Sequence, residues 1–220
     1  MNKADIIRNI EKKAKKFFVG ASGCHDWTHV ERVRLLAKNI GKKEKADIFV
    51  LDVAALLHDI AKNDEMIEKG LFCHAQEGVK MARKILQKMK FSEELISKIV
   101  HCIGTHRKRG KTKPESLEAR VLYDADKLDS IGAIGVARDF LFAGNAGSGT
   151  LYTGNEKKLM KSGKDHGYTE EDSAILEYET QLKFIKNKML TETGKLIAEE
   201  RDEYMRNFFK RFWLEVGGKK

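Results

Sequence analysis

The sequence is poor in proline and in long apolar runs. Among its 220 residues there is one proline, Pro114, and no apolar stretch approaches the roughly 18 residues that a membrane-spanning helix needs. Sustained two-residue alternation rich in β-branched residues is also missing, so few or no strands are expected. Lysine, glutamate, leucine, isoleucine and alanine are abundant, and these residues favour helices. We therefore expect an all-α protein with no membrane span.

Cysteine is scarce too. The three cysteines, Cys24, Cys73 and Cys102, form no Cys-x-x-Cys pair, so the spacing of a zinc ribbon is absent. Each cysteine adjoins a histidine, so two interpretations stay open: the cysteines bind a soft metal, or they are small buried thiols in the core. Because the zinc spacing is missing, we favour buried core thiols. The odd cysteine count and an N-terminal segment with the pattern of an amphipathic helix, not of a secretory signal, indicate a reducing, cytoplasmic setting.

Charged residues, by contrast, make up 34% of the chain, and the formal net charge is +9. Such an excess says more about partners than about fold. Two interpretations stay open: a lysine-rich solvated surface, or attraction to a partner rich in phosphate, such as a nucleotide or a nucleic acid.

Apolar residues recur at helical spacing along most of the chain. The expected helices cover residues 3–18, 29–41, 45–62, 75–89, 92–105, 116–140 and 171–213. We expect a single domain over residues 1–220, with a core at about 20–140, a glycine-rich insertion at about 143–170 and a C-terminal helical extension at about 171–215.

The glycine-rich insertion has six glycines and no convincing period, which is unusual inside a compact domain. A floppy excursion, a lid and a dimer arm are all consistent with this composition. Gly144 and Gly149 have the spacing of a phosphate-binding loop. However, Thr150 stands where that loop requires lysine and no strand precedes it, so this motif is excluded.

The dipeptide His58–Asp59 ends a strongly apolar stretch, "IFVLDVAALLHD". The pair is therefore expected on or near a buried helix surface, where an unpaired carboxylate is costly. Such a carboxylate needs either a hydrogen-bonded partner or a bound cation. For the dipeptide taken alone, a buried hydrogen bond between histidine and aspartate is the commoner explanation.

Other histidines and acids stand at the ends of helices or interrupt apolar segments. His29 opens an amphipathic helix that Asp26 or Thr28 can cap. Far downstream, three acids interrupt an otherwise apolar helix: Asp124, Asp126 and Asp129. A helix start would use one acid as a cap and would not need three.

Three more histidines lie between these positions. His74 precedes a helix start, and His101 and His106 bracket the sequence "CIGT". We interpret His101, in the middle of a helix, as a core histidine. His106 stands at a helix end beside a basic loop and is the better candidate for a ligand.

The order of these residues resembles that of the HD-domain metal-dependent phosphohydrolases, and in particular of their small single-chain branch with an "HDWxH" opening. The motifs that carry the resemblance are "HDWTHVERV", "AALLHDIAK", "CHAQEGVKMARKIL", "IVHCIGTHR", "DADKLDSIGAIGVAR" and the basic-aromatic C-terminal helix. They occur in this order and span nearly the whole chain.

The resemblance implies an HD-domain helical bundle with a metal site in a central cleft. The ligands that it assigns are His29, His58, Asp59 and Asp126. His25 and Asp26 would lie beside the site without binding the ion. His74 and His106 match the order of the histidines that bind a second ion in two-metal members, so one or two ions are expected.

Two histidines and two carboxylates suit a divalent ion in an octahedral field, such as manganese, magnesium, iron, cobalt or nickel. Such an ion lowers the pKa of a bound water and polarises a phosphoryl group. Asp59 would orient that water or accept its proton. Lys62, one helical turn after His58, is a candidate for binding a phosphate oxygen, and a solvated lysine is the alternative.

A basic cluster follows His106 directly in "HRKRGKTKPE". The candidate substrate contacts are Arg107, Lys111 and Lys113 of this cluster, together with Arg32. A basic rim of this kind attracts a polyphosphate tail. The alternative is an exposed turn with ordinary basic residues.

We expect a metal-dependent phosphohydrolase that acts on a small phosphorylated molecule, in the first place a nucleotide, and releases pyrophosphate from a nucleoside triphosphate. A nucleoside monophosphate phosphatase and a phosphodiesterase need the same metal centre and stay open. So does a function of another class, a catalytically weak module that binds nucleotides or nucleic acid. The net charge favours that module, and the complete ligand set argues against it. The sequence leaves the oligomeric state open.

Overall fold

The structure, a computed structural model, describes residues 2–21, 23–63, 74–107, 112–146, 149–164, 166, 169 and 171–220. Within these ranges the regular elements are all helices and no strand is present, which confirms the all-α expectation. The chain divides into two compact units. Unit 1 comprises Met1–Asp126 and Leu190–Thr193, and unit 2 comprises Lys127–Met189 and Gly194–Lys220. The expected single-domain organisation stays a prediction.

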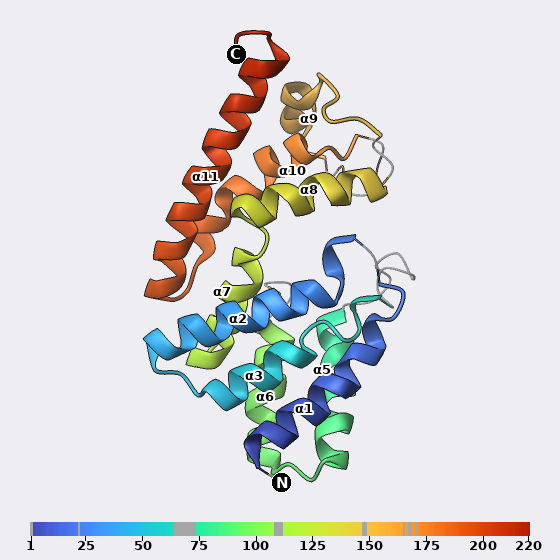
Figure 1. The fold of residues 1–220 in the computed structure, drawn as a ribbon, viewed down its shortest axis with the longest axis vertical. Helices are drawn as coiled ribbons and strands as arrows, with labels where there is room; N and C mark the ends of the chain where they lie inside the picture. Colours follow the sequence, from blue (N-terminus) through green and yellow to red (C-terminus); the bar gives the residue numbers. More distant parts are fainter. Residues whose placement is uncertain are drawn as a thin grey trace. The chain divides into compact units, whose positions relative to one another are not determined.

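Unit 1 is built around one apolar helix. Its elements are α1 (Lys3–Ala14), short 3-10 turns at Lys15–Phe18 and Gly23–His25, α2 (Trp27–Glu44), α3 (Ile48–Leu57), α5 (His74–Lys88), α6 (Glu93–Thr105) and α7 (Leu117–Leu128), whose last two residues belong to unit 2. Helix α3 packs against α1, α2 and α6, and α5 packs against α6 (Figure 1). Every residue from Val50 to Leu57 is buried, so α3 is the centre of the core.

Local capping sets the bounds of α2 and α3. Asp26 is the N-cap of α2, and its carboxylate accepts a hydrogen bond from the backbone N–H of His29. Lys45, in the left-handed region at φ 62°, ends α2, and Asp47 caps α3. The helix expected at 45–62 is therefore shorter. It ends at Leu57, and the His58–Asp59 dipeptide lies in the turn that follows.

Unit 2 contains α8 (Gly132–Ala146), α9 (Glu156–Ser162), α10 (Ala174–Thr180), a 3-10 helix (Leu182–Lys188) and most of α11 (Glu192–Val216). Helix α10 packs against both α8 and α9. The glycine-rich segment thus contains a short helix, α9, and the C-terminal run expected at 171–213 is three separate elements.

The continuous helix expected at 116–140 is wrong, because the chain breaks between α7 and α8. Gly132 adopts φ +81°, a left-handed conformation that glycine adopts without strain. A Cβ at this position would lie 2.9 Å from the side chain of Arg201, so the close approach also requires glycine. Arg201 in turn donates a hydrogen bond to the Leu128 carbonyl at the end of α7. The break is thus fixed by a contact with a distant part of the chain, which apolar periodicity does not reveal.

The chain returns to unit 1 at residues 190–193, where Asp124 holds it. The buried carboxylate of Asp124 accepts hydrogen bonds from the backbone N–H groups of Leu190 (2.9 Å) and Thr191 (2.8 Å) and from the Thr191 hydroxyl (2.6 Å). Burial raises the pKa of Asp124, and these hydrogen bonds oppose that rise. Asp124 therefore attaches the returning segment to the helix that carries Asp126.

None of the helices in the described ranges is long and apolar enough to cross a membrane.

Candidate metal centre

His58 and Asp59 lie in the buried turn after α3. The Nδ1–H group of His58 donates a hydrogen bond to the Ala55 carbonyl at 2.8 Å, because a carbonyl oxygen can only accept. In the neutral ring this leaves the lone pair on Nε2, which faces His29, Asp59 and Asp126. A carbonyl partner on the far nitrogen is how proteins commonly orient a metal-binding histidine.

Four donor atoms converge at this point. His29 Nε2 lies 3.3 Å from His58 Nε2, 3.5 Å from Asp126 Oδ1 and 3.6 Å from Asp59 Oδ2. His58 Nε2 lies 3.8 Å from Asp59 Oδ2 and 3.9 Å from Asp126 Oδ1. Ligands at right angles around an ion, each at ~2.1 Å, are about 3 Å apart. Each of the two histidines thus lies near both carboxylates, at separations close to those of a coordination shell.

The electrostatics keep His58 and Asp59 in their ligating forms. Burial lowers the pKa of His58 to about 4, so the ring is neutral at neutral pH. For Asp59, burial alone would raise the pKa, but His58, His106, His25 and His29 together hold it well below its usual value. A neutral imidazole and an ionised carboxylate are the states that bind a metal.

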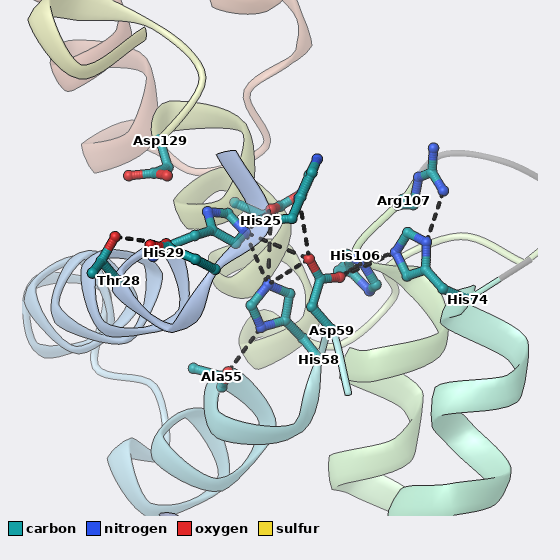
Figure 2. A network of polar contacts seen from close by, with 12 residues as sticks. His25, Thr28, His29, Ala55, His58, Asp59, His74, His106, Arg107 and Asp129 are labelled. Atoms are coloured by element: carbon teal, nitrogen blue, oxygen red, sulfur yellow. Dashed lines mark hydrogen bonds and ion pairs between the residues drawn. The ribbon is translucent and has the colours of Figure 1, made fainter. Parts of the chain in front are cut away.

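A second pair of histidines faces the other oxygen of Asp59. His74 Nε2 lies 3.1 Å and His106 Nε2 lies 3.3 Å from Asp59 Oδ1, and the two Nε2 atoms are 3.2 Å apart. Both rings are buried. Figure 2 shows Asp59 between the two pairs, with His29 and His58 on one side and His74 and His106 on the other. Asp59 Oδ1 is buried and has no hydrogen-bond partner among the described residues, which suits a ligand atom.

His25 lies closer to the cluster than expected. The 3-10 turn Gly23–His25 precedes α2 and places His25 Nδ1 at 3.6 Å from Asp59 Oδ2, beside the ring of His29. This nitrogen is buried, and no described residue forms a hydrogen bond with it. Burial lowers the pKa of His25 to about 4. The spacing of four between His25 and His29 was the only signal for this placement in the sequence, and His25 indeed lies outside the helix.

The other expected site residues are placed unevenly. Lys62 is buried, its backbone N–H donates to the Asp59 carbonyl at 2.9 Å, and its charge helps burial to lower the pKa of His25. Arg107 donates to His74 Nδ1 at 3.0 Å. Arg32 is half-buried and donates to the Thr28 hydroxyl, Lys113 is exposed, and Lys111 lies outside the described residues.

The remaining histidine and cysteine candidates join none of the possible ligand groups among the described residues, or cannot be placed. His101 accepts a hydrogen bond from the backbone N–H of Glu115, a residue outside the cluster. Cys24 and Cys102 are buried free thiols, and burial raises the pKa of Cys102 to about 12, as expected for a core thiol. Cys73 lies outside the described residues.

Comparison with known proteins agrees with this arrangement. The HD domain family matches residues 26–131, a range that includes all the expected ligands. The chain belongs to the HD-domain superfamily of metal-dependent phosphohydrolases. Within the superfamily it is 35% identical over 201 residues to the uncharacterized protein YpgQ of Bacillus subtilis, an alignment that covers 90% of this chain and 87% of YpgQ.

Solved structures give the same result. The crystal structure of Bacillus subtilis YpgQ in complex with ADP is 31% identical in the aligned region, with a TM-score of 0.71, and the match covers 96% of this chain and 95% of that one. A HD-superfamily hydrolase from Bacillus thuringiensis is 27% identical, with a TM-score of 0.73, over 98% of this chain and 99% of that one. Ribonuclease Y of Borrelia garinii subsp. bavariensis is 30% identical over 123 residues, which is 56% of this chain and 22% of the ribonuclease.

Proposed function

We propose that the protein is a nucleoside triphosphate pyrophosphohydrolase that cleaves its substrate to a nucleoside monophosphate and pyrophosphate. The observation that carries the proposal is that Nε2 of each of the buried histidines His29 and His58 lies within 3.9 Å of a carboxylate oxygen of buried Asp59 and of half-buried Asp126. Such a cluster of lone pairs is costly to bury without a cation. The donor set suits manganese first of all, and magnesium, cobalt, nickel or iron as alternatives.

A bound divalent ion would lower the pKa of a water molecule and neutralise charge on the phosphoryl group. The protein's own contribution is to hold the surrounding groups. Asp59, which is ionised and faces the centre, would orient such a water or accept its proton. Lys62 is buried three residues after Asp59, with its backbone N–H bonded to the Asp59 carbonyl, and it supplies a positive charge where negative charge develops on the phosphoryl oxygens.

The preference for a polyphosphate rests on charge. Most of the net charge of +9 belongs to unit 1, the unit that contains the cluster. Arg107, Lys111, Lys113 and Arg32 are the proposed substrate contacts, and Arg107 already lies against His74. The crystal structure of YpgQ contains ADP, and this supports a nucleotide as the ligand of the present chain as well. A basic surface attracts triphosphates more strongly than monophosphates, since the former carry more charge.

Product analysis tests the proposal. Purified protein is incubated with manganese, and separately with cobalt or magnesium, on a panel of nucleoside mono-, tri- and cyclic phosphates, with Asp59→Ala as the inactive control. We expect pyrophosphate and a nucleoside monophosphate from triphosphates, and no product with the variant.

The other outcomes each contradict the proposal in a defined way. Orthophosphate from monophosphates would make the protein a nucleotidase, and turnover of cyclic phosphates would make it a phosphodiesterase. No product across the panel, with metal bound and with salt-dependent binding of an oligonucleotide, would favour a nucleic-acid-binding module.

A further inference from the structure

The contact between Arg107 and His74 bears on how many ions the centre holds. Arg107 Nη1 lies 3.0 Å from His74 Nδ1, at the edge of the cluster (Figure 2). A guanidinium has five N–H groups, accepts no hydrogen bond and keeps its charge in proteins. The direction of this bond is therefore fixed: Arg107 donates and His74 Nδ1 accepts.

This direction determines the tautomer of His74. A neutral imidazole has one hydrogen, and because the Nδ1 lone pair accepts from Arg107, that hydrogen lies on Nε2. The Nε2 atom is the one that faces Asp59 Oδ1 and His106. In this tautomer His74 is a donor toward the cluster, whereas a metal ligand must present a lone pair.

His106 has the complementary tautomer. Its Nδ1–H group donates to the Ile103 carbonyl at 2.6 Å, so its Nε2 carries a lone pair. His74 Nε2–H donates to that lone pair across 3.2 Å. The pair therefore satisfies its own polar groups without an ion. His29 and His58 make a similar contact between their Nε2 atoms at 3.3 Å, but they face two carboxylate oxygens where the second pair faces one.

We propose that Arg107 restricts the centre to one metal ion, bound by His29, His58, Asp59 and Asp126, by holding His74 as a hydrogen-bond donor. The fixed positive charge of Arg107 acts in the same direction, because it repels a second cation beside His74. His74 is then a positioning residue for Asp59 and His106. This inference rests on the proposed metal-dependent function and concerns the number of ions in the same site.

Asp59, His74 and His106 could bind a second ion if His74 presented a lone pair to it. The proposal can therefore be tested by looking for a gain of bound metal. Ligand atoms of Asp59, His74 and His106 all lie within 4.8 Å of one another. Asp59 Oδ1 has no hydrogen-bond partner among the described residues, so it is available. Without Arg107, His74 can place its hydrogen on Nδ1 and turn its Nε2 lone pair toward the other two groups.

The test measures manganese per chain, not activity. Metal-free wild-type protein, Arg107→Met, Arg32→Met and the double variant Arg107→Met with His74→Ala are each equilibrated with Mn²⁺, and bound metal is counted by elemental analysis. Electron paramagnetic resonance then reports whether two ions are coupled, as expected at the separation of about 4 Å found in two-metal sites. Circular dichroism checks that each variant keeps its helical content.

We expect one ion in the wild type, two coupled ions in Arg107→Met and one ion in the double variant. Arg32→Met, which removes a guanidinium bonded to Thr28 and not to a histidine, should keep one ion. Two ions in the wild type, or one ion in a folded Arg107→Met variant, would overturn the inference and leave the proposed function intact. A folded wild type that binds no Mn²⁺ would instead contradict the proposed function and the inference with it.

Discussion

Asp59 in unit 1 and Asp139 in unit 2 are both buried carboxylates, yet their surroundings are opposite. Each has one oxygen without a hydrogen-bond partner among the described residues. Histidines face Asp59, and its pKa lies well below the usual value in spite of burial. Asp139 is buried near Glu177 and Asp172, and its pKa lies well above the usual value, against the weaker pull of Arg138. Burial together with neighbouring acids thus favours the neutral form of Asp139, whereas the histidines around Asp59 favour the ionised form that a metal site needs.

The largest effect should separate these two carboxylates by metal content. In Asp59→Asn, as in His58→Ala and Asp126→Ala, a ligand is lost, so we expect loss of bound metal and a fall in turnover of more than about a thousandfold. Metal analysis and initial rates measure both quantities. Asp139→Asn is the matched control and should keep its metal and its turnover. Normal turnover in any of the three ligand variants would show that the ligand assignment is wrong.

A smaller effect should come from Lys62, the buried lysine three residues after Asp59. Lys62→Met removes a charge proposed to stabilise the phosphoryl oxygens, so kcat should fall about a hundredfold while bound metal stays at the wild-type level. The comparison is between kcat and metal content in the same preparation. If kcat is unchanged, Lys62 is a structural lysine, and its burial has no catalytic meaning.

The basic cluster should affect binding more than chemistry. Lys111→Ala combined with Lys113→Ala is expected to raise KM for triphosphates several-fold. KM for monophosphates should change less, because a monophosphate carries fewer negative charges for the two lysines to attract. Steady-state kinetics with both substrate classes at two salt concentrations measures this difference. Equal changes for both classes would remove the argument for a polyphosphate substrate.

The smallest effect concerns stability and belongs to Asp139. Its folded-state pKa is raised above the value of 3.8, so the folded protein keeps a proton that the unfolded chain releases. Stability from this group therefore falls as pH rises from about 3.8 through the folded-state pKa. Asp139→Asn removes that fall, and we expect it to be more stable than the wild type at pH 7 by on the order of 1 kcal/mol. Denaturant unfolding at pH 4 and pH 7 should show a difference at the higher pH only, and an equal difference at both would exclude ionisation as the cause.

The candidate ligands could be found in the sequence because they lie in short motifs with strong local signals. The apolar run before His58 indicated burial, and the acids around Asp126 were too many for a helix cap. The family resemblance then ordered these residues along the chain, and the structure places them together. The position of His29 followed from its place at the start of α2. The sequence allowed two caps for this helix, and Asp26 is the one that the structure shows.

What could not be predicted depends on contacts between distant residues. The break at Gly132 requires the side chain of Arg201, which lies far along the chain. The contact between Arg107 and His74 joins residues 33 positions apart, and nothing in the basic run "HRKRGK" distinguishes Arg107 from its neighbours. Periodicity and motif spacing describe local structure, so neither contact has a sequence signal.

The hydrogen bonds of Asp124 with Leu190 and Thr191 have a consequence for the order of folding. They join residues 66 and 67 positions apart, and closing so long a loop costs chain entropy before the contact offsets it. Contacts of this range slow folding, and local helices form first. We therefore expect Asp126, two residues after Asp124, to reach its final place only when the returning segment has docked. The nascent chain should accordingly be a poor chelator until its C-terminal part has been synthesised, and metal loading becomes a late step of maturation.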